Sequence, residues 1–125
     1  TALRAICGMI RTSGDVRLFG EKITGKSPEA IVRMGLAHVP DGQAAAGFCA
    51  TAALIVIDDA TAANPCAAGA TVLTKRDLAR RGSAAVRFAG AGISVEFAIP
   101  EPCRLWHVHR RFSREARGMA PWQPR

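Results

Sequence analysis

The sequence predicts an α/β fold whose C-terminal half is poorly ordered or irregular. Short helical patterns and strand patterns succeed one another in the first half of the chain, as in α/β proteins. A continuous apolar run at 53–57 predicts a buried strand. Beyond residue 100, arginines and prolines with isolated aromatic side chains follow neither period, so we expect a poorly ordered tail.

The first elements are a short helix and a hairpin. Apolar residues at i, i+3, i+4 and i+7 within 3–10 form one helical face. Gly8 provides a stop, because glycine takes the left-handed conformation without steric cost. Strand residues at 16–18 and a turn at Gly20 then predict a hairpin or arch that returns through Ile23.

A capped helix and a second strand follow. Ser27 is a good N-cap, and Pro28 suits the first helical position because its missing N–H is not needed there. Gly35 ends this helix. The run 36–39 predicts a strand that Pro40 stops.

Two more elements are expected after the buried strand. The stretch 74–81 predicts one helical piece that ends at Gly82. The stretch 93–99 alternates well enough for a strand that ends at Pro100.

The composition changes at residue 44, and we predict two regions, 1–43 and 44–125. The second region holds twenty Ala and ten Arg but one Lys and no Tyr. Ala, Arg, Gly and Pro have the most GC-rich codons, so two interpretations stay open. The region is either a divergent extension or the out-of-frame translation of a GC-rich gene, and its fold is left undecided.

The net charge is +7, and the last 22 residues hold six Arg and one acid, Glu115. Such an excess favours nucleic acid or anionic surfaces through long-range attraction. A solvated basic tail without a partner is the alternative. No apolar run approaches the length of a membrane span, and no segment resembles a targeting peptide, so we expect neither.

The cysteines do not form a recognisable pattern. Cys7, Cys49, Cys66 and Cys103 are far apart and include no C-x-x-C pair. In a chain without a signal peptide we expect them reduced, in a reducing cytoplasm, as small semi-buried apolar residues.

Two further clusters of candidate residues lie near the C-terminus. Cys103, His107 and His109 form C-x-x-x-H-x-H, and on a strand the two His would share a face. No fourth ligand is apparent and two arginines follow, so we predict no metal site. Trp106 and Trp122 stand among arginines and are able to stack on bases, although two isolated rings are a weak signal.

The stretch 1–43 contains dense, ungapped matches to one family pattern. A helix of the type T-x-L-R-A-I-x-G, a hairpin of the type S-G-x-V-R-x-x-G-x-x-I-T-G, a short helix and a strand ending in G-x-A-H-V-P-E-G occur in this order. The matching residues are Thr1, Leu3, Arg4, Ala5, Ile6, Gly8, Ser13, Gly14, Val16, Arg17, Gly20, Ile23, Thr24, Gly25, Pro28, Ile31, Val32, Arg33, Gly35, Ala37, His38, Val39, Pro40 and Gly42. Over this stretch the chain resembles the ATP-binding subunits of ABC transporters, most closely those for branched-chain amino acids.

The resemblance implies a fragment of a P-loop NTPase, running from just after the phosphate-binding loop through the Q-loop region. It implies ATP and Mg²⁺ as cofactors, permease subunits and a second ATPase subunit as partners, and a cytoplasmic place on the inner face of the plasma membrane. The resemblance places the family's Gly-rich loop ahead of Thr1, and no segment spells its Leu-Ser-Gly-Gly-Gln signature. We therefore expect no ATP hydrolysis by this chain.

The resemblance also suggests two cofactor-binding residues. Thr1 matches the second Thr of Gly-Lys-Thr-Thr, whose hydroxyl would face the α-phosphate; an exposed chain terminus is the alternative. Asp41 matches the acid of the Q-loop, which links the catalytic site to the membrane subunits. An ordinary Pro-Asp-Gly turn is the alternative there.

Asp58 and Asp59 are the candidate catalytic residues. They follow the apolar run 54–57, which is similar to a Walker B strand, where the first acid holds Mg²⁺ and the second polarises the attacking water. Two features depart from the family: the second acid is usually Glu, and the short distance from Asp41 leaves no room for the family's helical subdomain. An apolar run followed by two acids also arises by chance.

Three functional hypotheses result. The chain is a partial ATP-binding subunit of an ABC importer for branched-chain amino acids, a small basic module that binds nucleic acid or anionic surfaces weakly and without sequence preference, or a truncated product without function.

Overall fold

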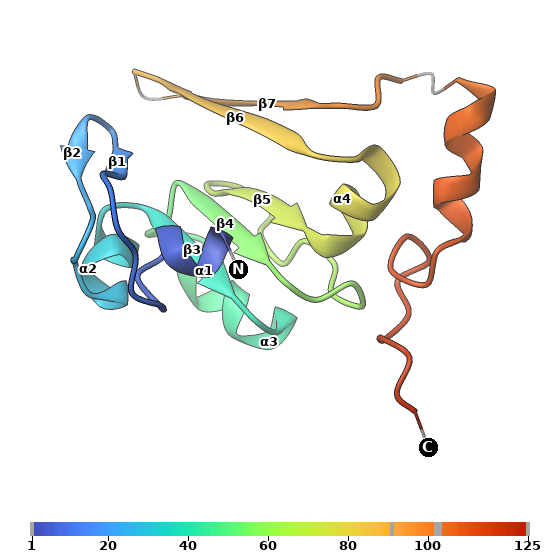
Figure 1. Ribbon diagram of the computed structural model, residues 1–125, viewed down its shortest axis with the longest axis horizontal. Helices are drawn as coiled ribbons and strands as arrows, with labels where there is room; N and C mark the ends of the chain where they lie inside the picture. The colour runs from blue at the N-terminus through green and yellow to red at the C-terminus, as the bar shows by residue number, and fades with distance from the viewer. Residues whose placement is uncertain (1, 91, 102–103, 125) are drawn as a thin grey trace.

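A three-stranded parallel sheet forms the centre of the chain. The computed structural model describes residues 2–90, 92–101 and 104–124 (Figure 1). The sheet has the order β3 (Leu36–Val39), β4 (Leu54–Ile57), β5 (Thr71–Thr74). All four residues of β4 are buried. A parallel strand that is covered on both faces carries a continuous apolar run. The buried strand expected at 53–57 is thus confirmed as β4.

One face of the sheet is covered by the N-terminal elements and by a long hairpin. These elements are α1 (Ala2–Ile6), the β1–β2 hairpin (Arg17–Leu18 and Glu21–Lys22) and the antiparallel pair β6 (Ala84–Ala89) and β7 (Gly92–Phe97). The β6–β7 hairpin extends over the sheet toward β1–β2 (Figure 1). Its inward side chains pack on Leu36, Leu54, Val56 and Leu73 of the sheet.

The opposite face is covered by α3 (Gly42–Ala45) and the 3₁₀ turn η1 (Ala46–Phe48). Together with the segment before β5, they bury Ala37, Val39, Ile55 and Ile57. Alternate residues of each strand thus supply two separate apolar clusters, one on each face.

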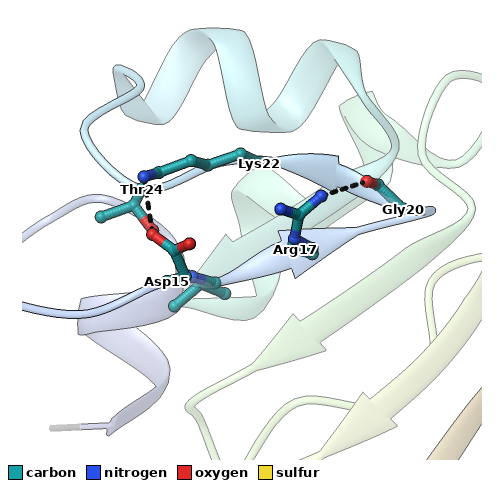
Figure 2. Close-up of polar contacts among 6 residues, drawn as sticks. Asp15, Arg17, Gly20, Lys22 and Thr24 are labelled. Carbon is teal, nitrogen blue, oxygen red and sulfur yellow. Dashed lines mark hydrogen bonds and ion pairs between the residues drawn. The ribbon is translucent and has the colours of Figure 1, made fainter.

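The β1–β2 hairpin is held by a tight turn and by polar contacts between its two sides (Figure 2). Phe19 and Gly20 both have positive φ, 52° and 80°, as the two central residues of a type I′ hairpin turn do. The Arg17 Nη1 atom donates to the Gly20 carbonyl at 3.3 Å, and Lys22 pairs with Asp15 at 2.6 Å. The strained Phe19 packs edge-on against Phe88 of β6, with ring centroids 4.7 Å apart, so the hairpin is joined to the core.

The two helices expected from capping signals are confirmed. In α2 (Pro28–Arg33), Ser27 Oγ accepts from the Ala30 N–H at 3.2 Å. In α4 (Lys75–Arg81), Thr74 and Asp77 form a reciprocal capping box, and Gly82 caps the C-terminus.

The expectation of an irregular C-terminal half is corrected for several segments. β5 and β6 form regular strands, and η2 (Leu105–Phe112), a 3₁₀ helix, packs beside α4. The strand expected at 93–99 is confirmed as β7. The signals were weak because alanine dilutes the alternation of β6 and because a 3₁₀ helix follows neither the helical nor the strand period. The change in composition at residue 44 is no structural boundary, since β3 pairs with β4 across it.

The expectation of reduced cysteines is also corrected. Cys49 and Cys66 form a disulfide, with their Cα atoms 5.5 Å apart. The bond joins the end of η1 to the loop after β4, on one face of the sheet. A separation of 17 residues gave no local signal for this pairing. Among the described residues, Cys7 is a free thiol, and burial raises its pKa.

Candidate functional site

The carboxyl edge of the parallel sheet gathers the charged residues expected to carry chemistry. Parallel strands end at one edge, where α/β proteins bind their ligands. Asp41 follows β3, Asp58 and Asp59 follow β4, and Lys75 follows β5. The loops after β3 and β4 touch: a Cβ on Gly42 would overlap the Ala62 side chain. The fold therefore brings the loop of Asp41 against the loop of the two candidate catalytic acids.

Asp58 lies in a cleft of about 220 Å³ and is paired there. Its Oδ1 is 3.1 Å from Lys75 Nζ, and both side chains are partly exposed. His38 of β3 lines the same cleft. Burial lowers the pKa of His38, and the nearby Asp58 carboxylate opposes this shift. The imidazole is therefore neutral at pH 7.

Asp59 is turned toward its own loop. Its Oδ1 accepts from the Thr61 hydroxyl at 2.6 Å and from the Thr61 N–H at 2.8 Å. The hydroxyl bond and then the backbone bond lower the pKa of Asp59, with smaller contributions from the N–H groups of Gly42 and Ala62. A carboxylate held in this way stabilises its own loop and is not positioned to polarise an attacking water molecule.

Asp41 has a structural role that its sequence context allowed. Its Oδ1 accepts from the N–H groups of Gln43 and Ala44 at 3.0 and 3.1 Å, so it is the N-cap of α3. Thr1, the other suggested cofactor-binding residue, lies outside the described residues.

The residues at this edge do not fit a bound Mg²⁺. The ion takes near-octahedral oxygen ligands and is usually held by one or two carboxylates together with phosphates. Here Asp58 is matched by an ammonium group, while Asp41 and Asp59 accept hydrogen bonds from their own loops. Among the described residues, no group of three His, Cys, Asp or Glu is placed to hold a metal.

A pattern that the sequence reasoning missed is G-x-x-x-x-G-K-S at 20–27, which has the spacing of a phosphate-binding loop. The structure gives it another role. Gly20 turns the β1–β2 hairpin, Lys26 Nζ pairs with Glu21 at 3.0 Å, and Ser27 caps a six-residue helix. A phosphate-binding loop joins a strand directly to a helix, so this match is a coincidence of spacing.

The C-terminal histidines are not brought together. In η2, His107 faces the cleft beside Asp77 and Arg80, whereas His109 is exposed. The strand that would have put both on one face does not form, because the segment is a 3₁₀ helix. Cys103 lies outside the described residues.

Known proteins give no further assignment. No protein-family model, curated protein or solved structure matches this chain. Within the described ranges, none of the helices has the length and apolar character needed to cross a membrane.

Proposed function

We propose that the chain is a partial ATP-binding subunit of an ABC importer for branched-chain amino acids and that, in this form, it does not hydrolyse ATP. The dense family matches in 1–43 support the kinship. The main structural support for the proposal is the position of Asp58 and Asp59. They lie at the end of the buried central strand, beside the loop of Asp41. This is the position that the similarity to a Walker B strand requires.

The expected lack of ATP hydrolysis is explained by the bonding of the acids at the same edge of the sheet. Stabilising the charge that develops on the transferred phosphoryl group is the largest catalytic contribution in such enzymes. Asp58 is paired with Lys75, and Asp59 is bonded to Thr61, so neither acid is arranged for metal or water. By the resemblance, ATP with Mg²⁺, permease subunits and a second ATPase subunit belong to the intact parent protein.

Phosphate release from ATP by the purified chain tests the inactivity. We expect release equal to a protein-free blank, with or without Mg²⁺. Asp58→Asn should change nothing, and neither should the control Asp15→Asn, an exposed acid in the β1–β2 hairpin region. Activity that Asp58→Asn abolishes and Asp15→Asn preserves would show that the edge is catalytic.

The flanking DNA tests the kinship. We expect codons for Gly-Lys-Thr directly ahead of Thr1 and the Leu-Ser-Gly-Gly-Gln signature in another reading frame downstream. Their absence in every frame would contradict the transporter assignment without bearing on whether the chain hydrolyses ATP.

A further inference from the structure

The outer side of η2 carries a column of exposed rings. In a 3₁₀ helix, residues i and i+3 eclipse one another, about 6 Å apart along the axis. Trp106, His109 and Phe112 have this spacing, and all three are exposed, Trp106 by 62% and Phe112 by 70%. We call these three residues the ring column.

The opposite side of η2 fixes the helix to the rest of the fold. Arg110 Nε donates to the Ala79 carbonyl of α4 at 3.3 Å, and His107 is half-buried in the cleft beside α4. Figure 1 shows η2 with one side toward α4 and the other away from the chain. The ring column therefore stands on an anchored element, which limits the entropy lost when a ligand binds.

The ring column itself is partly preorganised. The His109 Nδ1 atom is 2.6 Å from the Trp106 carbonyl, and because a carbonyl only accepts, Nδ1 donates its proton there. The Arg104 guanidinium lies 5.2 Å from the centre of the Trp106 ring. A cation thus stands next to the first ring.

The segment that carries the ring column is rich in positive charge. The segment 104–124 has five arginines and one acid, Glu115. Arg110, Arg114 and Arg117 each donate a hydrogen bond to a backbone carbonyl, which leaves their positive charge in place. A polyanion with flat apolar groups is the matching ligand.

We propose that the ring column is a binding site for single-stranded nucleic acid, in which Trp106, His109 and Phe112 stack on bases and the neighbouring arginines contact phosphates. Base faces are open in single strands and closed in duplexes. An anionic membrane is the competing ligand, because η2 exposes apolar side chains within a basic segment. The His109 imidazole within the column and the Arg104 guanidinium 5.2 Å from the Trp106 ring favour stacked bases with phosphates.

Fluorescence anisotropy of labelled oligothymidylate and oligouridylate tests the site with the full chain. We expect binding at low salt that weakens steeply toward physiological salt, and duplex DNA should compete poorly. Trp106→Ala and Phe112→Ala should each weaken binding roughly tenfold at fixed salt. Arg104→Gln should lower the log–log salt slope by about 0.7, the value for one phosphate contact on a single strand.

Matched controls separate stacking from general stickiness. Trp122→Ala removes an exposed ring outside the column, and Arg33→Ala removes an exposed charge at the end of α2. Both should bind like the original chain, and circular dichroism should show all variants folded. Equal losses for Trp106→Ala and Trp122→Ala, or full competition by duplex, would overturn the proposal. So would tighter binding to phosphatidylserine vesicles than to either oligonucleotide.

Discussion

The carboxylates at the edge of the sheet and the rings on η2 differ in how far the fold satisfies them. Asp41 and Asp59 each have a partner within a few residues, and Asp58 is paired with Lys75, the first residue after β5. Trp106 and Phe112 are mostly exposed, although the helix that carries them is anchored. Carboxylates that are hydrogen-bonded or ion-paired within the fold stabilise the structure, whereas exposed aromatic rings on an anchored helix are accessible to a ligand.

Because the carboxylates at the edge of the sheet are bonded within the fold, we expect changes in this region to alter the free energy of unfolding. The largest effect is expected for the Cys49–Cys66 disulfide, which closes a loop around β4. Reduction should lower the free energy of unfolding by about 3 kcal/mol, mainly by releasing the unfolded chain. Urea unfolding with and without dithiothreitol measures it. The double variant Cys49→Ser/Cys66→Ser should be insensitive to the reductant, and an equal response there would point to another cause.

The N-cap at Asp41 should matter next. Asp41→Ala leaves two N–H groups of α3 without their acceptor and should cost about 1 kcal/mol in urea unfolding. Asp41→Ser restores a capping oxygen and should be close to the original. If Asp41→Ser is as unstable as Asp41→Ala, the carboxylate has a role beyond capping.

Asp59 should make stability depend on pH. Its pKa is lowered in the folded chain from the ordinary 3.8, so its contribution is complete above that value and is lost as pH falls through the folded pKa. Asp59→Asn should therefore destabilise the chain at pH 6, and the difference should shrink in strong acid. Thr61→Val, which removes the hydroxyl donor, should reduce the same pH dependence. Unfolding curves that stay parallel across this range would contradict the assignment.

The smallest effect is expected on η2. Trp106→Ala and Phe112→Ala remove exposed rings and should change the free energy of unfolding by less than about 0.5 kcal/mol. Thermal or urea unfolding of the variants used in the binding assay measures this. A loss comparable to that at Asp41 would mean that the rings pack against the fold, and the contrast between the two regions would fail.

Local signals predicted much of the fold. Ser27 and Pro28 located α2, the apolar run located β4, and Gly82 located the end of α4. Long-range features could not be predicted in this way. Pairing of Cys49 with Cys66 depends on packing of η1 and a loop on one face of the sheet, which no residue spacing encodes.

The sequence predicted which acids lie at the candidate site, but it did not predict their ion-pair and hydrogen-bond partners. The strand pattern put Asp58 at the end of β4 correctly. Its partner Lys75 follows β5, a strand that the sequence did not reveal, so the ion pair could not be foreseen. The ring column was hidden for a similar reason, because its spacing becomes meaningful only once the segment is known to be a 3₁₀ helix.

The covalent loop closed by the Cys49–Cys66 disulfide also changes which fragments a protease would release. Thr61, Ala63, Asn64 and Pro65 are exposed within it, at the kind of loop where nicking concentrates. A cut there leaves β3 and β5 on one covalently connected molecule, since the two new ends remain tied through the sulfur bridge. Fragments would separate only after reduction, so the nicked chain would keep its full mass on a non-reducing gel.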